Sequence, residues 1–227
     1  MSEHFELTLP GARTIFSTRR GGVSEGPFES LNLGLLTDDV PERVMENRGR
    51  LKAHVGVDHV ALGRQVHGTD LQTWIGPPTD GEPPEVDGHM TDEPGLGLLV
   101  QVADCLPVAL ATRSRVGMLH CGWRGLAGGI IARALERFEE PPAAAIGPGI
   151  GCCCYEVGEE VLEAFGRTGE RRLDLRAITR SQLEAGGVTG VLEVDLCTSC
   201  HPELFFSHRR DEGVTGRQAG IVVRDGS

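Results

Sequence analysis

Residues 104–125, DCLPVALATRSRVGMLHCGWRG, consist of two short apolar segments on either side of a polar turn at residues 111–115. This pattern predicts an antiparallel β-hairpin whose first strand continues from residues 96–103 and whose second strand covers residues 116–119. A turn centred between Thr112 and Arg113 places Cys105 directly opposite His120, with Cα atoms about 4.5–5.5 Å apart. The hairpin therefore predicts that a thiol and an imidazole meet.

The Cys105–His120 pair fits two kinds of chemistry. Thiolate and imidazole are both common zinc ligands, and a cysteine beside a histidine base is also an activated nucleophile. His67, in the sequence Gln-Val-His-Gly, is a candidate third ligand. One cysteine and two histidines leave the fourth corner of a zinc tetrahedron open, as a catalytic zinc requires. From the residues alone, an open zinc site, a metal-free Cys-His pair and simple packing all remain as interpretations.

The predicted strands and helices follow no strict alternation. We expect strands at 5–9, 12–17, 60–62, within 65–75, and at 96–103, 143–146, 191–196 and 216–223, and helices from about 39–42 to 55 and at 126–138, 155–165 and 176–185. Residues 76–85 are predicted to be a surface loop and residues 86–91 a polar turn. The mixture favours an α+β fold over a doubly wound sheet, in one domain covering residues 1–227.

Composition narrows the classes of function. The net charge of −11 and the isoelectric point near 5.2 argue against non-specific binding to nucleic acid or to anionic membranes. No apolar run is long enough to cross a bilayer, and the N-terminus lacks the pattern of a signal peptide. The cysteine count is odd, at seven, and three of the cysteines are consecutive, at 152–154. We therefore expect a reduced, cytoplasmic protein.

Three other motifs have both a functional and a structural interpretation. Cys197-Thr198-Ser199-Cys200 has the spacing of a zinc or redox motif, but a second C-x-x-C is missing from the sequence, which favours a structural interpretation. Residues 147–151, GPGIG, match neither a P-loop nor a dinucleotide fingerprint. Arg19 beside the Gly21-Gly22 pair predicts either an anion site or an ordinary turn with solvated arginines.

Taken together, these motifs resemble the YfiH family, also known as the DUF152 or multicopper polyphenol oxidase family. The resemblance extends along nearly the whole chain and rests on these segments: 18–24 (TRRGGVS), 30–34 (SLNLG), 46–48 (ENR), 65–68 (QVHG), 103–108 (ADCLPV), 120–125 (HCGWRG), 147–150 (GPGI), 154–158 (CYEVG), 207–211 (SHRRD) and 216–217 (GR).

The resemblance implies a compact domain of stacked mixed β-sheets flanked by helices. It implies that His67, Cys105 and His120 ligate zinc, and that the substrates are phosphate and a purine nucleoside, namely adenosine, inosine, guanosine or methylthioadenosine. It also implies hydrolytic deamination of adenosine. We expect a monomer or weak homodimer that binds neither nucleic acid nor membrane.

Roles for further residues follow from the chemistry. Phosphorolysis needs phosphate held at the ribose, and arginine grips phosphate bidentately. The candidate phosphate ligands are Arg19, Gly21, Gly22, Arg124 and Arg209. Asp104 is a candidate acid/base or a group that orients a histidine ligand. Cys105 and His120 are also the candidate catalytic residues.

Alternative functions come from the same family and from the residues. One is a metal-free Cys-His amidohydrolase that acts on a peptidoglycan precursor, and another is a non-catalytic module that binds a nucleotide-like ligand. A multicopper oxidase needs many imidazole ligands and His-x-His pairs. The chain has eight histidines and no His-x-His, so we interpret any laccase-like activity as adventitious copper at the Cys/His/His site.

Overall fold

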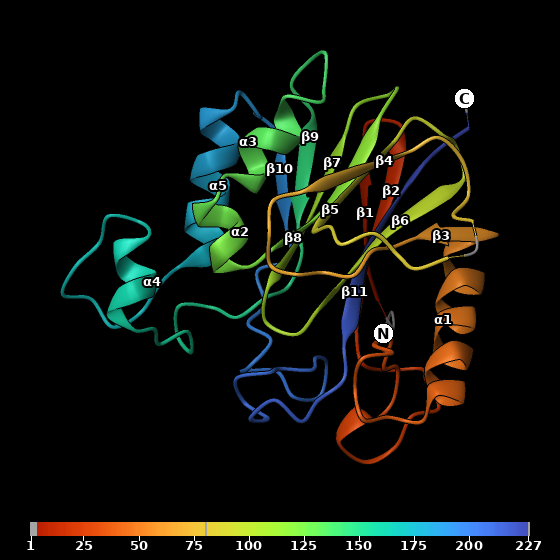
Figure 1. The fold of residues 1–227 in the computed structure, drawn as a ribbon, viewed down its shortest axis with the longest axis horizontal. Helices are drawn as coiled ribbons and strands as arrows, with labels where there is room; N and C mark the ends of the chain where they lie inside the picture. The colour runs from red at the N-terminus through yellow and green to blue at the C-terminus, as the bar shows by residue number, and fades with distance from the viewer. Residues whose placement is uncertain (1–3, 80, 227) are drawn as a thin grey trace.

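Two mixed β-sheets stack face to face at the centre of the computed structural model, which describes residues 4–79 and 81–226 (Figure 1). The five-stranded sheet has the order β1 (His4–Leu9), β2 (Ala12–Ser17), β11 (Gln218–Arg224), β6 (Leu96–Val102) and β3 (His59–Ala61). The six-stranded sheet has the order β10 (Val191–Glu193), β9 (Ala143–Ile146), β7 (Leu106–Ala111), β8 (Val116–Cys121), β5 (Gly88–Thr91) and β4 (Leu71–Trp74).

Helices cover the outer face of each sheet, which gives an α-β-β-α arrangement. One outer layer is α1 (Pro41–Val55); the other contains α2 (Trp123–Ala127), α3 (Ile130–Leu135) and α5 (Leu175–Ala185), while α4 (Glu159–Glu163) projects to one side (Figure 1). A short 3₁₀ helix covers Gly26–Phe28. The predicted α+β class and the stacked mixed sheets are confirmed.

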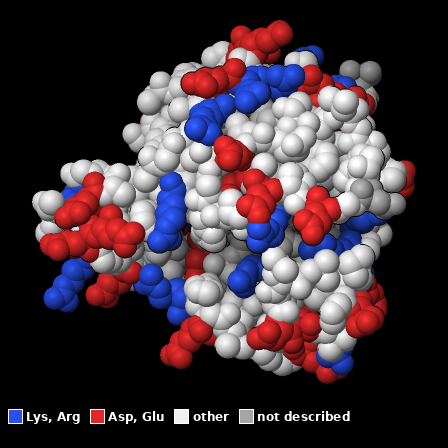
Figure 2. Space-filling view, in the orientation of Figure 1, with Lys and Arg blue, Asp and Glu red and all other residues white. Residues whose placement is uncertain are grey.

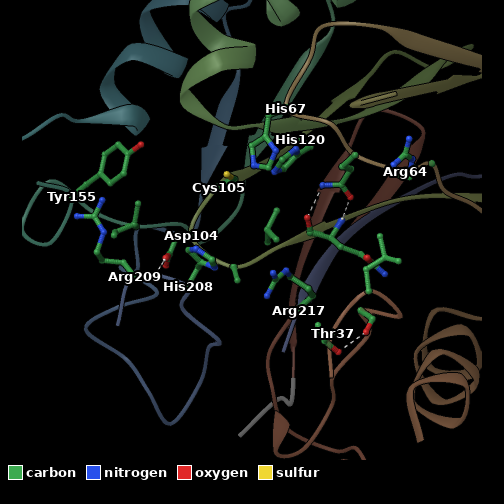
Figure 3. A pocket seen from close by; sticks show the side chains of 18 residues that line it. Thr37, Arg64, His67, Asp104, Cys105, His120, Tyr155, His208, Arg209 and Arg217 are labelled. Atoms are coloured by element: carbon green, nitrogen blue, oxygen red, sulfur yellow. Dashed lines mark hydrogen bonds between the residues drawn. The ribbon is translucent and has the colours of Figure 1, made fainter. Parts of the chain in front are cut away.

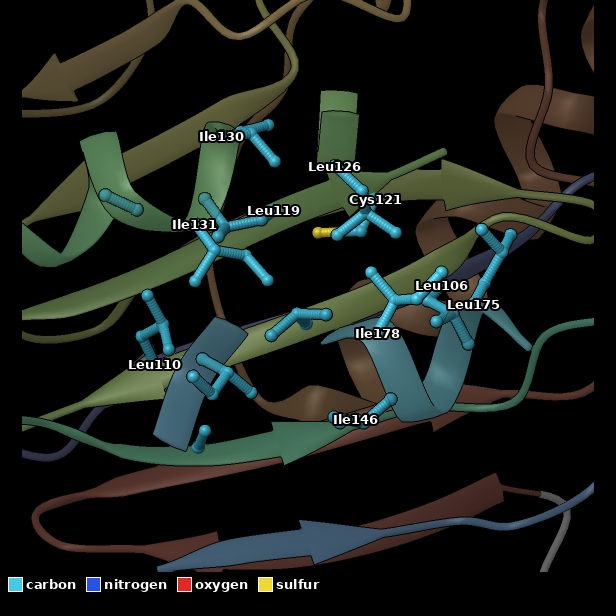
Figure 4. Packing of buried hydrophobic residues seen from close by; sticks show 14 of the residues in the cluster. Leu106, Leu110, Leu119, Cys121, Leu126, Ile130, Ile131, Ile146, Leu175 and Ile178 are labelled. Carbon is cyan, nitrogen blue, oxygen red and sulfur yellow. The ribbon is translucent and has the colours of Figure 1, made fainter. Parts of the chain in front are cut away.

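Three apolar clusters hold these layers together. Phe16, Leu98 and Met118 belong to the cluster between the two sheets. Leu51 and Ile221 belong to the cluster between α1 and the five-stranded sheet. The third cluster lies between the six-stranded sheet and α2, α3 and α5 (Figure 4). Strand β7 is buried on both faces because Val108 and Leu110 point to the helices while Ala109 points to the other sheet.

The hairpin between β7 and β8 forms, but its predicted register is wrong by two residues. His120 pairs with Pro107, and Ala111 pairs with Val116. The Thr112 N–H donates to the Arg115 carbonyl at 2.9 Å, and the Arg115 N–H donates to Thr112 Oγ1 at 3.1 Å, so the turn centre moves one residue along the chain. A shift of two residues leaves each side chain on the same face of the strand.

Three other predicted elements differ from the structure. Residues 86–91, predicted to be a turn, contain strand β5, whose His89 is buried and accepts a hydrogen bond from Trp74 Nε1 at 3.2 Å. The helix predicted at 126–138 is divided into α2 and α3 because Gly129 has a left-handed φ of 85°. The helix predicted at 155–165 is reduced to α4, since Glu156 instead forms a β-bridge with Arg172.

The surface carries both signs of charge. Figure 2 shows acidic and basic side chains interspersed on the visible face, where several arginines lie next to carboxylates. Within the described part of the chain, none of the helices combines the length and the apolar character that crossing a bilayer requires.

The two sheets approach each other closely at Gly220, where a larger side chain would not fit. A Cβ added to Gly220 on β11 would lie 2.6 Å from Pro107 Cβ and 3.2 Å from Met118 Sδ, both in the opposite sheet. By contrast, a Cβ added to Gly49 in α1 would have no neighbour within 4 Å.

We therefore expect opposite effects from two glycine-to-alanine substitutions. Gly220→Ala should lower the free energy of unfolding by about 1–3 kcal/mol, because it overpacks the space between the sheets. Gly49→Ala should raise it by about 0.4–1 kcal/mol, because it lowers the entropy of the unfolded chain at a helical position. Urea denaturation measures both, and equal effects would contradict this account of the packing.

Candidate metal centre

The site is built around the segment by which the chain passes from one sheet to the other. Strand β6 of the five-stranded sheet ends at Val102, and β7 of the six-stranded sheet begins at Leu106. Asp104 between them has a φ of 97°, in a region that residues other than glycine seldom adopt. Its carboxylate accepts hydrogen bonds from Thr198 Oγ1 at 2.6 Å and from the Arg209 N–H at 2.7 Å. These bonds hold Asp104 in this conformation. Cys105 consequently lies directly before the first residue of β7.

His67, Cys105 and His120 converge at this point. Cys105 comes from the link between β6 and β7, His120 from β8 and His67 from the turn before β4 (Figure 3). One ligand atom from each lies within 4.8 Å of the other two, and the two imidazole rings are 4.9 Å apart between centroids. His67 is exposed, Cys105 is partly buried and His120 is buried. The structure thus brings together the three predicted metal ligands, although their pairing across the hairpin is not the predicted one.

The Asp87 carboxylate organises two of these three side chains. It is fully buried and accepts the backbone N–H groups of Val66, His67 and Gly68 at 3.1, 3.0 and 2.7 Å. It also contacts His120 Nδ1 at 2.7 Å. With Nδ1 engaged, the His120 ring presents Nε2 to Cys105. A carboxylate that holds one nitrogen of a histidine while the other faces a metal is a recurring arrangement.

The thiol and the imidazole share charge in the metal-free protein. Burial raises the pKa of Cys105, but the charge of His120 and hydrogen bonds from His120 and His67 outweigh burial and lower that pKa from 9.0 to about 6. Burial lowers the pKa of His120, but the Cys105 thiolate and Asp87 raise it from 6.5 to about 9. At neutral pH, the pair is therefore a thiolate and an imidazolium.

Gly122 leaves room for the side chains of Cys105 and His67. A Cβ at this position would lie 3.0 Å from Cys105 Sγ and 3.1 Å from His67 Cδ2. Any other residue here would push the sulfur and the imidazole apart.

A cavity of about 440 Å³ opens in front of the cluster. The side chains of Tyr155, His208, Arg209 and Arg217 contribute to its wall (Figure 3). The Arg209 guanidinium lies 5.4 Å from the centre of the Tyr155 ring and donates from Nη1 to the Glu156 carbonyl. Burial raises the pKa of Tyr155 to about 12, so its hydroxyl remains a hydrogen-bond donor at neutral pH.

Only one of the predicted phosphate ligands is among the described residues of the cavity wall. Arg209 lines the cavity, whereas Arg19, Gly21, Gly22 and Arg124 are not among the described residues of its wall. Arg19 lies over the Phe206 ring, the Gly22 N–H donates to Ser30 Oγ and Arg124 lies over the Trp123 ring. These groups have local structural partners.

Sequence reasoning missed two residues of the site. Arg217 lines the cavity, and its place in the Gly216-Arg217 motif was the available signal. Asp87 was missed because residues 86–91 were predicted to be a polar turn, whereas its side chain is buried. Asp104, proposed as a group that orients a histidine, contacts Thr198 and Arg209 instead, and Asp87 contacts the histidine.

The donor set fits a single transition-metal ion. One thiolate and two imidazole nitrogens are the ligands that zinc takes, and copper also accepts them. A tetrahedral ion held by these three side chains would have its fourth position free for water or substrate.

Comparisons with known proteins agree with this architecture. The family model described as multi-copper polyphenol oxidoreductase laccase matches residues 13–225. The chain belongs to the YfiH family. It is 37% identical to the purine nucleoside phosphorylase YlmD of Geobacillus stearothermophilus, over 94% of this chain and 90% of that protein. It is also 37% identical to the purine nucleoside phosphorylase YfiH of Escherichia coli K12, over 93% of each.

Solved structures of YfiH family members have the same fold. A DUF152 protein from Neisseria meningitidis superimposes with a TM-score of 0.89 at 34% identity, covering 99% of this chain and 100% of that one. The crystal structure of YlmD from Geobacillus stearothermophilus gives 0.85 at 35% identity, over 95% and 93%.

Replacement of Asp87 tests its role in orienting the cluster. Asp87→Asn keeps the volume but removes the negative charge beside His120, and we expect metal affinity to fall about 10–100-fold. Competition with a chromophoric chelator measures this affinity. Asp70→Asn is the matched control, because Asp70 is exposed and pairs with Arg133 at the surface. Equal affinities in Asp87→Asn and the unmodified protein would contradict the assignment.

The thiolate gives a pH-dependent prediction for the metal-free protein. Alkylation of Cys105 by iodoacetamide should rise with pH through a midpoint near 6 and level off above pH 7, because about nine-tenths of the thiol is then ionised. His120→Asn should move the midpoint upward, because it removes the charge and the hydrogen bond of His120 that oppose the effect of burial. Peptide mass spectrometry after chelation measures the labelling. Cys121, whose pKa is raised by burial, should stay unlabelled and serves as the internal control.

Proposed function

We propose that the chain is a zinc-dependent purine nucleoside phosphorylase whose metal ligands are His67, Cys105 and His120. The observation that carries this proposal is the convergence of these three side chains at the base of a cavity that arginines also line. The names of the relatives in Geobacillus and Escherichia support the reaction class. Zinc is favoured because the donor set is mixed sulfur and nitrogen with one open position.

Phosphorolysis transfers ribose from a purine to phosphate. A phosphate oxygen bonds to ribose C1′ while the bond from C1′ to the purine nitrogen breaks, and the base leaves with a proton. Arg209 and Arg217 are the cavity arginines that we assign to phosphate, because both belong to the wall beside the metal ligands. We assign the purine to the side of the cavity formed by Tyr155, whose ring offers a stacking face and whose hydroxyl offers a proton for a hydrogen bond.

The same cavity also fits deamination of adenosine. A zinc ion held by the three side chains would polarise substrate oxygen and lower the pKa of water at its open position. Asp87 would keep His120 in one orientation throughout, and the buried Asp104 would keep Cys105 and the Arg209 backbone in place. We therefore assign Asp104 a positioning role instead of proton transfer.

A second candidate function rests on the thiolate–imidazolium pair. Without metal, Cys105 would be the nucleophile and His120 the acid/base of an amidohydrolase, for example one that edits a peptidoglycan precursor. The lowered pKa of Cys105 favours this reading of the metal-free site.

A turnover assay decides between these functions. The purified protein is incubated with adenosine, inosine, guanosine or methylthioadenosine, with and without phosphate, and products are separated by chromatography. Free base that requires phosphate supports phosphorolysis, and inosine from adenosine supports deamination. Both should disappear with the metal in Cys105→Ala. Turnover of a muropeptide amide by metal-free protein, with no reaction on nucleosides, would instead support the amidohydrolase. A protein that binds a nucleoside but turns over neither nucleosides nor the muropeptide amide would support the non-catalytic binding module.

Arginine substitutions locate the phosphate. Arg209→Gln should raise KM for phosphate about 10–100-fold, since one charge-assisted contact contributes about 1.5–3 kcal/mol. Arg124→Gln is the matched control and should leave KM unchanged, because Arg124 lies over Trp123 outside the cavity. A raised KM in Arg124→Gln, with no change in Arg209→Gln, would show that Arg124 binds the phosphate and Arg209 does not.

A further inference from the structure

A second cluster of metal-binding side chains lies outside the cavity. Cys153 and Cys154 follow β9, and Cys197 and Cys200 follow β10, so two loops that are far apart in the sequence supply two cysteines each (Figure 1). All four sulfurs lie within 4.8 Å of one another. Sγ of Cys200 is 3.5 Å from that of Cys153 and 3.4 Å from that of Cys154.

These distances fit a tetrathiolate metal site better than disulfides. A disulfide holds its sulfurs about 2.05 Å apart, and all four cysteines are free thiols. Four sulfurs at about 2.3 Å from a central zinc ion lie about 3.8 Å apart, which is the separation for a tetrahedron. The observed pairs are therefore close to the size of an occupied cage.

The backbone around the cluster is arranged to support thiolates. The Gly151 N–H donates to Cys197 Sγ at 3.2 Å. A Cβ on Gly151 would lie 3.2 Å from Cys153 Sγ and 3.5 Å from Cys197 Sγ, so the backbone itself packs against the sulfurs. The two loops are also joined directly, since the Thr198 N–H donates to the Gly149 carbonyl at 3.0 Å. Such N–H donors to sulfur and close packing are features of the outer shell of metal–thiolate sites.

We propose that Cys153, Cys154, Cys197 and Cys200 bind a second, structural zinc ion. Four thiolates fill the tetrahedron and leave no open position, so this ion stabilises structure and takes no part in the reaction. The C-x-x-C motif supplies one half of the site. The other half is an adjacent cysteine pair, which is why a search for a second C-x-x-C does not find it.

The four-cysteine cluster lies next to residues of the cavity wall. Cys154 is followed by Tyr155, which lines the cavity, and Cys197 is followed by Thr198, which holds the Asp104 carboxylate. An ion bound to both loops fixes two elements of the cavity wall relative to each other. Its loss should loosen the wall while leaving His67, Cys105 and His120 in place.

Metal analysis of variants of the full chain tests the proposal. Protein expressed with zinc in the medium is purified under reducing conditions and measured by mass spectrometry of the metal. The double variant C153S/C200S should contain one zinc ion per chain fewer than the unmodified protein. Cys152→Ser, which changes the exposed neighbour outside the cluster, should lose none. Cys105→Ala reports on the cavity site separately, so failure of either site is visible without the other.

A measurement that leaves all four cysteines of the cluster in place avoids any failure of a cluster variant to fold. Cobalt is substituted for zinc in the chain and in Cys105→Ala. Intense sulfur-to-cobalt charge-transfer bands and tetrahedral ligand-field bands should persist in Cys105→Ala, because four thiolates remain. Ellman's reagent should detect four fewer reactive thiols in Cys105→Ala loaded with zinc than after chelation. Equal zinc content in C153S/C200S and the unmodified protein, disulfides among the four cysteines under reducing conditions, or iron in place of zinc would overturn the proposal.

Discussion

The buried carboxylate of Asp87 is the contact on which the rest of the site depends. A charge taken out of water costs free energy unless hydrogen bonds replace hydration. Asp87 accepts three consecutive backbone N–H groups from residues 66–68 and faces the His120 ring. Its own backbone carbonyl accepts the His120 N–H at 2.7 Å. A single residue thus ties the loop of one metal ligand to the strand of another.

The ionisation of Asp87 links this contact to stability. Burial raises its pKa, but the hydrogen bond with His120, the charge of His120 and the N–H groups of Gly68 and Val66 outweigh burial and lower the pKa below 3.8. Because the folded-state pKa lies below the unfolded one, the ionised carboxylate stabilises the fold above pH 3.8. That stabilisation is lost as the pH falls through the folded-state pKa.

Sequence patterns predicted the apolar strands well, but they did not predict features that depend on side-chain hydrogen bonds or on contacts between distant segments. Strands β7 and β8 are continuous apolar segments, so the hairpin could be predicted from the sequence. The two-residue error in its register arose because the Thr112 side chain bonds the Arg115 N–H and fixes the position of the turn. Cys105 and His120 could be paired because an error of two residues preserves the face, whereas His67 was grouped with them through the resemblance of its Gln-Val-His-Gly segment. Asp87 could not be predicted, since residues 86–91 have the sequence of a polar turn and Asp87 is buried only by tertiary contacts such as that with His120. The cysteine cluster could not either, because its two halves are far apart in the sequence and are brought together by tertiary pairing, such as that of Gly149 with Cys197.

The name of the family refers to several copper ions, whereas the candidate metal-binding side chains of this chain form two separate clusters. A multicopper oxidase holds several copper ions, largely through imidazole. Among the described residues, the two groups of His, Cys, Asp and Glu side chains close enough to hold a metal are the His67 cluster and the four-cysteine cluster. Only the first contains histidine, and it contains two. His89 has one nitrogen bonded to Trp74 and lies fully buried on β5, where burial lowers its pKa to about 4. With imidazole so scarce at both clusters, a set of cooperating copper ions lacks its ligands. The arrangement of residues instead favours two separate sites, one with a single thiol and two imidazoles and one with four thiols.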